Sequence, residues 1–131
     1  MTFLSRDAIL GADDQDYAEV DCPEWGGKVR LRSISGAERD AYEASCIVQK
    51  GNSRTVNMKN ARAKLIVLMA VDEHGSRLFN EDDIRALAKK NARPIDRLFD
   101  ACQKLAGITE EDMDSLTANL EEMQADDSDS G

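Results

Sequence analysis

Proline, aromatic residues and long apolar runs are all scarce in this chain of 131 residues. The two prolines leave helices largely uninterrupted, and an aromatic content of 5% means that the core is mostly aliphatic. The longest apolar run, residues 65–71, has seven members. A helix needs about 20 apolar residues to span a bilayer, so the run predicts a buried core element and no membrane segment.

Cysteine and histidine are also sparse. Cys22, Cys46 and Cys102 lie far apart, and no C-x-x-C pair occurs. This spacing suggests neither a zinc site nor a disulfide framework, and Cys46 and Cys102 are interpreted as small core residues. The single histidine, His74, falls in a predicted turn without a partner for general base catalysis. With no phosphate-binding loop or EF-hand motif either, we expect no enzyme, no cofactor and no metal site.

The first ten residues lack the basic leader and the apolar segment of a signal peptide. Free cysteines suit a reducing compartment. We therefore expect a soluble protein of the cytoplasm.

Basic residues are fewer than acidic ones, and the two kinds are unevenly distributed along the chain. The formal net charge is −9, which argues against binding to the backbone of a nucleic acid. Residues 57–106 carry 10 basic and 7 acidic side chains, whereas residues 107–131 carry 9 acidic ones and no Lys or Arg. The net charge of residues 107–131 therefore equals the net charge of the whole chain, −9.

The apolar run organises the predicted fold. Periodicity alone does not distinguish helix from strand in so short a run. Met58, Ala61, Leu65 and Leu68 repeat at spacings of three and four, so we predict a helix over residues 57–70 and a tight turn at 72–75. Leu68 is expected in the core, where replacement by alanine would cost about 2–5 kcal/mol.

Two short strands are predicted before this helix. Residues 17–20 and 28–34 flank a glycine-rich turn, and the second strand alternates between apolar and polar positions. Arg30 and Arg32 then form a basic outer face, which either docks an acidic partner or is an ordinary solvated strand face. Trp25 is either a lid over the core of the hairpin, the reading that we favour, or an exposed anchor.

Further helices are predicted from capping signals and from 3.6-residue periodicity. They cover approximately residues 5–10, 35–49, 80–88 and 94–106. Ser35 and Glu38 form a capping box at the start of the second, and Gly51 and Asn52 stop it. The last begins with Pro94, stops at Gly107 and has an apolar face of Ile95, Leu98, Cys102 and Leu105. The apolar stripe of the second consists of Ala37, Ala41, Ala44 and Val48, and it is widened by Tyr42 and Ile47. The predicted fold class is mainly α, a small helical domain with one short antiparallel β-hairpin near the N-terminus.

Residue 108 is the predicted boundary between two parts of the chain. Residues 1–108 form a helical domain with the β-hairpin, and residues 109–131 form an acidic C-terminal helix and a disordered tail. One edge of this last helix carries Met113, Leu116, Leu120 and Met123. This edge either binds a partner, since methionine adapts to many surfaces, or closes the helical bundle. A third possibility is that the acidic segment covers a partner-binding groove on its own basic middle.

Five sequence blocks occur in a suggestive order. They are MTFLSRDAIL, PEWGGKVRLR, SGAERDAYE entering a helix, and the pair ARAKLIVLMAVDEHGSRLFNEDD and IDRLFDACQKLAGI. Over residues 1–110 this order resembles that of the tail assembly chaperones of long-tailed bacteriophages. The resembling motifs are structural, so the likeness carries over no catalytic residue.

The resemblance implies a function in virion morphogenesis. A member of this family would bind the tape measure protein and keep its apolar helices soluble in the host cytoplasm until tail tube subunits assemble around it. It would be absent from the mature virion. A programmed frameshift could add a second domain that contacts the tail tube protein, and a homo-oligomer is possible.

Two other classes of function stay open from the residues. An acidic mimic of nucleic acid would inhibit a DNA-binding protein, but many of the acids lie in a connector and in the tail rather than on a rigid surface. A small enzyme would need polar residues paired at catalytic spacing, and none is recognised. Partner capture would separate these readings from the chaperone.

Overall fold

An antiparallel hairpin lies near the N-terminus of the computed structural model, which describes residues 2–56 and 60–108. Strands β1 (Tyr17–Cys22) and β2 (Gly27–Arg32) pair from Tyr17↔Arg32 to Cys22↔Gly27. The short 3-10 helix η1 (Pro23–Trp25) joins them and ends at Gly26, whose φ of 80° glycine adopts without steric cost. The predicted hairpin is confirmed. The prediction of a mainly helical fold class is confirmed as well.

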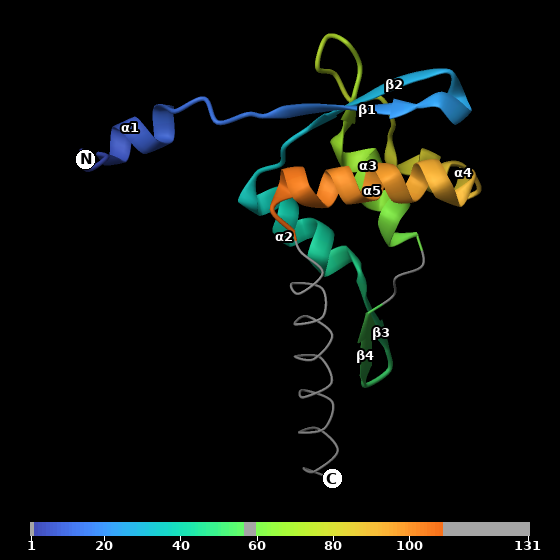
Figure 1. Cartoon of the computed structure of the whole chain (residues 1–131). Coiled ribbons are helices and arrows are strands. Elements are labelled where there is room, and N and C mark those ends of the chain that lie inside the picture. Colours follow the sequence, from blue (N-terminus) through green and yellow to red (C-terminus); the bar gives the residue numbers. More distant parts are fainter. Residues whose placement is uncertain (1, 57–59, 109–131) are drawn as a thin grey trace.

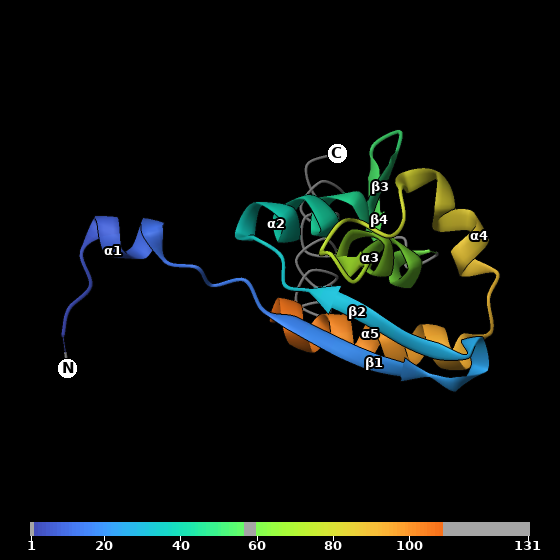
Figure 2. The ribbon, with the colours of Figure 1, turned by 90° about the horizontal axis from the view of Figure 1, so that it is seen from above.

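Helices α3 (Ala61–Met69) and α5 (Ala92–Ala106) pack beneath this hairpin (Figures 1 and 2). The predicted helix over residues 57–70 is confirmed in its centre, but α3 begins at Ala61 and ends at Met69. The next two residues form β5 (Ala70–Val71), which pairs with β2 and completes a sheet of order β1-β2-β5. Residues 57–59 lie outside the described part of the chain.

Helix α3 is buried on nearly every side rather than along one stripe. Its buried residues are Ala61, Ala63, Leu65, Ile66, Val67 and Met69. Leu68, predicted to lie in the core, is only partly buried. The reason is that the sheet, α4 and α5 all contact α3, so an apolar residue at almost any helical position meets another element.

A second hairpin replaces the end of the predicted 35–49 helix. Helix α2 (Gly36–Ser45) stops early and is followed by β3 (Ile47–Lys50) and β4 (Ser53–Val56), which pair from Ile47↔Val56 to Lys50↔Ser53. Gly51 has a φ of 60° in the two-residue loop, as a hairpin turn with glycine first requires. The Gly-Asn pair predicted to stop a helix therefore turns a hairpin.

Local capping signals place the remaining helices. Asn80 and Asp83 form a reciprocal capping box over the 3-10 helix η2 (Glu81–Asp83), which leads into α4 (Ile84–Ala88). Gly107, with a φ of 71°, ends α5 as predicted. Pro94 was expected at the first position of that helix and is in fact its third residue.

The predicted turn at residues 72–75 is confirmed. Asp72 Oδ1 accepts hydrogen bonds from the backbone N–H groups of His74 and Ser76, at 2.8 and 3.0 Å, and these bonds lower the pKa of Asp72. Gly75 closes the turn with a φ of 85°. His74 is exposed, as expected of a turn residue.

Cys22, Cys46 and Cys102 are free and buried. Burial raises the pKa of Cys102 to about 12 and also raises the pKa of Cys22. These thiols are therefore packing residues. Within residues 2–56 and 60–108, no helix has the length and apolar character to cross a membrane.

Candidate partner-binding groove

A groove of about 400 Å³ lies between α2, α3 and the η2–α4 segment, and we call it the α2–α3–α4 groove. Its lining residues are Glu38, Ala41, Tyr42, Ser45, Lys64, Val67, Leu68, Arg77, Glu81 and Ile84. Protein sites for other molecules typically have volumes of roughly 300–1,000 Å³ and an apolar lining with a few polar groups. The groove fits this description.

The floor of the groove is apolar. Val67 and Leu68 come from α3, one fully and one partly buried, and face Tyr42 of α2. Tyr42 is held in place because its hydroxyl donates a 3.0 Å hydrogen bond to the carbonyl oxygen of Ala61. Burial raises the pKa of Tyr42. Partly buried Ile84 of α4 extends this floor, so an apolar side chain entering the groove would meet carbon on three sides.

One exposed alanine of α2, Ala41, belongs to the wall of the groove. Ala37, Ala41 and Ala44 were predicted to face the core, but all three are exposed, while Tyr42 and Cys46 are buried. The expected stripe is therefore wrong at its three alanines and confirmed at Tyr42. Ala41 lines the groove, and its small side chain leaves room for a partner.

Charged side chains stand at the rim. Lys64 Nζ donates to the carbonyl oxygen of Ser45 at 3.0 Å, and Arg77 Nη2 donates to that of Val67 at 3.3 Å. Glu81 is also part of the rim. The rim thus offers both signs of charge around an apolar floor, which can orient a partner as well as hold it.

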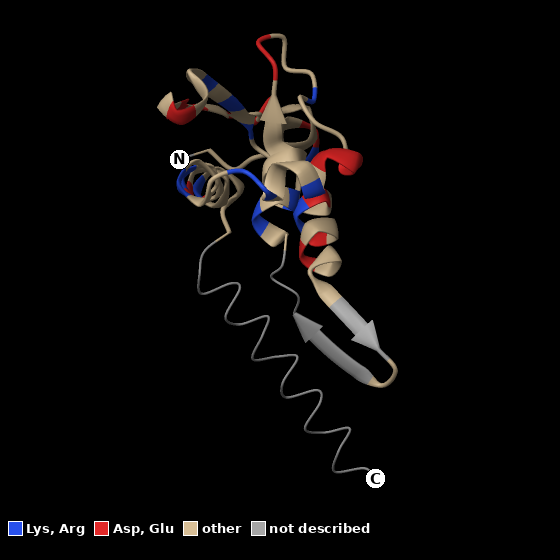
Figure 3. Ribbon diagram, turned by 90° about the vertical axis from the view of Figure 1, so that its right-hand side faces the viewer, with Lys and Arg blue, Asp and Glu red and all other residues tan. Residues whose placement is uncertain are grey.

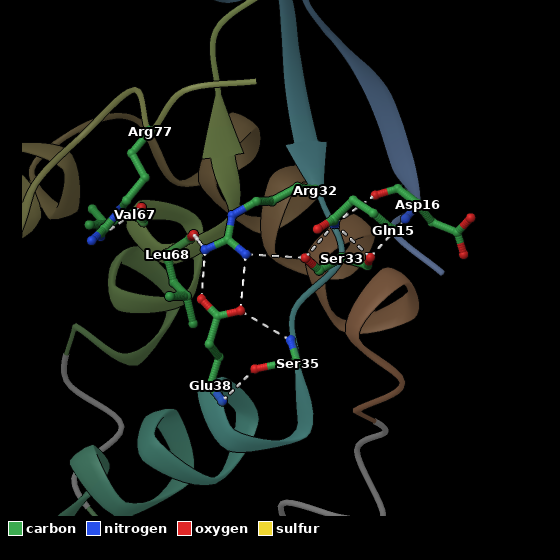
Figure 4. Close-up of polar contacts among 9 residues, drawn as sticks. All are labelled: Gln15, Asp16, Arg32, Ser33, Ser35, Glu38, Val67, Leu68 and Arg77. Atoms are coloured by element: carbon green, nitrogen blue, oxygen red, sulfur yellow. Dashed lines mark hydrogen bonds and ion pairs between the residues drawn. The ribbon is translucent and has the colours of Figure 1, made fainter. Parts of the chain in front are cut away.

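Arg32 joins the sheet to α2 and α3, the helices that bear the wall and the floor of the groove (Figure 4). Its guanidinium makes a bidentate contact with Glu38 of α2, at 3.1 and 2.8 Å, and donates to the carbonyl oxygen of Leu68 at 3.0 Å. Glu38 also caps the N-terminus of α2 with Ser35, as predicted. The Arg32 guanidinium lowers the pKa of Glu38 to about 2.

The structure gives Arg30 and Arg32 partners on their own chain. The Arg30 guanidinium lies 4.3 Å from the centroid of the Tyr17 ring and donates to the carbonyl oxygen of Glu73. Binding of an acidic partner by these two arginines stays a prediction. Trp25, expected in the core, is 38% exposed.

The other predicted partner-binding residues, Met113, Leu116, Leu120 and Met123, lie outside the described residues. The groove itself was missed by reasoning from sequence. The sequence offers one sign of the groove, which is Ala41, a small apolar residue on a helix that needs an apolar face.

These features define a class of protein, a small helical domain with an apolar groove and, within residues 2–56 and 60–108, no cluster of side chains suited to a metal. The family model described as phage tail assembly chaperone matches residues 6–116. The chain belongs to this family. Membership of a chaperone family implies a non-enzymatic role.

A solved structure shares the fold. The tail assembly chaperone of bacteriophage HK97 has a TM-score of 0.52 to this chain at 19% sequence identity, over 78% of this chain and 91% of that one. A comparison with curated protein sequences finds no match.

Proposed function

We propose that this chaperone binds the tape measure protein and keeps its apolar helices soluble during tail assembly, with the α2–α3–α4 groove as the binding surface. The observation that carries the proposal is an apolar groove, walled by two helices, in a member of the tail assembly chaperone family. A long helical protein with apolar stripes needs such masking because exposed apolar surface aggregates.

The groove suits one amphipathic helix. Helices dock into grooves through apolar residues spaced at i, i+3, i+4 and i+7. Val67 and Leu68 give the floor two adjoining apolar contacts, and Ala41 leaves clearance above them. Lys64, Arg77 and Glu81 would then contact polar residues at the sides of the bound helix. We propose further that this complex forms in the host cytoplasm and that the chaperone leaves before the virion is complete.

Ala41→Glu should weaken binding to a tape measure fragment by about tenfold or more, which is roughly 1.4 kcal/mol, because the longer side chain would occupy the groove and set a carboxylate against its apolar floor. Titration calorimetry with a helical tape measure segment measures the effect. Ala86→Glu is the matched control, since Ala86 is also an exposed helical alanine but does not line the groove. Equal binding by the two variants would show that the α2–α3–α4 groove is not the binding site for the tape measure fragment.

A competition experiment with DNA separates the chaperone from an acidic inhibitor of a DNA-binding protein. Basic and acidic residues are interspersed over the described body rather than forming one acidic face (Figure 3). We therefore expect no competition between this protein and DNA for a DNA-binding partner.

Truncation to residues 1–108 should leave a folded protein that binds the tape measure fragment more tightly than the full chain. The reason is that residues 107–131 carry 9 acidic side chains next to a middle segment with 10 basic and 7 acidic ones, so the end of the chain could cover the groove. Circular dichroism checks the fold, and titration at low and high salt checks the electrostatic part. Equal or weaker binding by a folded truncation would rule out this self-masking.

A further inference from the structure

Strand β1 forms one edge of the three-stranded sheet. Strand β2 pairs with one side of β1, and among the described residues no strand pairs with its other side. In Figure 2, β1 lies along the outer side of the molecule, with β2, α2 and α3 on its other side. A free strand edge presents a row of unpaired backbone N–H and C=O groups, to which another extended chain can bind.

The pairing with β2 determines which groups of β1 face outward. The N–H of Ser33 donates to the carbonyl oxygen of Asp16 at 2.8 Å, and this residue pair continues the register of the two strands. In an antiparallel pair of strands, hydrogen-bonded residue pairs alternate with pairs that are not bonded. Tyr17, Glu19 and Asp21 therefore direct their N–H and C=O groups away from β2.

Arg97 of α5 agrees with this direction and closes one end of the free edge. Its Nη1 donates to the carbonyl oxygen of Asp21 at 3.2 Å, while the same guanidinium contacts Glu24 at 2.8 and 2.9 Å. Within the described residues, the N–H and C=O groups of Tyr17 and Glu19 have no hydrogen-bond partner, and neither has the N–H of Asp21. These groups are available to a further strand.

The exposed face of this edge is acidic. Residues 12–27, which follow helix α1 (Arg6–Gly11) and end at the start of β2, carry six acidic side chains and no Lys or Arg. Glu19 and Asp21 are the two acids on β1 itself, and both are exposed. A strand that is added beside them would have its own side chains within reach of both carboxylates.

The basic residues of β2 leave these carboxylates available. Lys28 Nζ lies 4.0 Å from Asp21 Oδ1, and both side chains are largely exposed. Such an exposed pair contributes little to stability. Arg30 lies opposite Glu19, but its guanidinium donates to the carbonyl oxygen of Glu73. An incoming basic side chain would therefore displace no strong ion pair.

Like charges disfavour two occupants from the protein's own sequence. Antiparallel pairing of β1 with β1 of a second copy would set Glu19 and Asp21 of one chain near those of the other. Residues 107–131 carry 9 acidic side chains and no Lys or Arg, so this edge would repel them as well. Charge complementarity instead favours a basic segment of another protein.

The opposite face of the edge is apolar. Ala18 and Val20 alternate with the acids and are half-buried, and Val20 packs against the core. Because side chains of a strand alternate between two faces, an added strand would set every second residue beside Ala18 and Val20 and the others beside the acids. A fitting partner therefore has apolar residues at alternate positions.

We propose that β1 binds an extended segment of another protein in which Lys or Arg alternates with apolar residues. The segment adds to the sheet as an antiparallel strand opposite Tyr17, Glu19 and Asp21, and Arg97 limits its extension toward η1. Hydrogen bonds of the backbone provide affinity, and the alternation provides specificity. The contact is separate from the α2–α3–α4 groove and does not depend on the tape measure protein.

Titration of the full chain with the end-blocked peptide Lys-Val-Lys-Val-Lys, followed by NMR, tests the proposal. We expect binding, together with slower hydrogen exchange of the Tyr17 and Glu19 amides. Glu19→Gln/Asp21→Asn should weaken binding by about three- to tenfold, the range for two exposed ion pairs. The matched control Asp40→Asn/Asp100→Asn removes two exposed carboxylates from α2 and α5 and should bind as the wild type does.

Two N-methylated forms of the peptide separate strand addition from attraction between charges. In the antiparallel arrangement, the lysine N–H groups face β1 and the valine N–H groups face solvent. Methylation of the lysine backbone nitrogens should therefore abolish binding, whereas methylation of the valine nitrogens should preserve it. Equal binding by the two forms, or binding without protection of the Tyr17 and Glu19 amides, would overturn the proposal, because the peptide would then contact acidic residues elsewhere. Absence of binding would overturn it too.

Discussion

Replacing Leu65 by alanine should lower the free energy of unfolding by about 2–5 kcal/mol, the cost of a cavity in a packed core. Leu65 is 0% exposed in α3, a helix that contacts both the sheet and α5. Such a loss is a large share of the roughly 5–15 kcal/mol that stabilises a domain. Chemical denaturation followed by circular dichroism measures it, with an unchanged denaturant slope indicating that only stability has altered.

Leu68→Ala is the matched control on the same helix. The sequence pattern predicted a full core effect at Leu68, but its side chain is partly exposed in the groove. The loss of stability should therefore be smaller than for Leu65→Ala. A greater loss at Leu68 would mean that the groove closes over that side chain in solution.

Arg32→Met should lower the free energy of unfolding by about 1.5–3 kcal/mol, the range for hydrogen bonds to charged groups. Methionine keeps most of the length of the side chain but removes the bonds to Glu38 and to the Leu68 carbonyl oxygen. The cost should stay below that of breaking a fully buried pair, because the Arg32 and Glu38 side chains are 17% and 35% exposed. Arg32→Lys should recover only part of the loss, since lysine cannot make a bidentate contact.

The same contact makes stability depend on pH. The pKa of Glu38 is about 2 in the folded protein, against an ordinary value of 4.5. The unfolded chain therefore binds more protons than the folded chain between these values, and this contribution to stability is lost as the pH falls from about 4.5 towards 2. Glu38→Gln should flatten the profile there, while glutamine keeps the capping contact.

A second arginine–glutamate ion pair also lowers the pKa of its glutamate, and it serves as a comparison for the Arg32–Glu38 pair within the same protein. Arg97 contacts Glu24 at 2.8 Å and lowers the pKa of Glu24 to about 2. Glu24→Gln should remove a separate part of the acid-induced loss. The Arg97 side chain is 39% exposed against 17% for Arg32, so this part should be the more sensitive to salt. If Glu38→Gln and wild type lose stability identically between pH 5 and about 2.5, the Arg32 contact does not persist in solution.

Local signals predicted the elements whose boundaries depend on neighbouring residues. The capping box at Ser35 and Glu38 and the left-handed Gly107 lie where expected, because each satisfies backbone groups within a few residues. The apolar repeat of α5 likewise predicted its buried face, including Leu98 and Cys102. These features need no knowledge of the tertiary structure.

Features set by distant contacts could not be predicted in the same way. The β3–β4 hairpin was missed because Gly51-Asn52 serves equally well to end a helix or to turn a hairpin. The groove was missed because it exists only where α2, α3 and α4 approach one another. Ala41 belongs to an apolar stripe in sequence, and only that approach decides whether the stripe is covered.

The three buried thiols give the protein a built-in reporter of its own opening. Cys22, Cys46 and Cys102 are each 0% exposed, so a thiol reagent does not reach them in the closed molecule, and burial also raises the pKa of Cys102 to about 12. Labelling must wait for a fluctuation that exposes β1, the end of α2 or α5. The modification rate of each cysteine would therefore measure how often its own segment opens, and would reveal whether these segments separate together or one at a time.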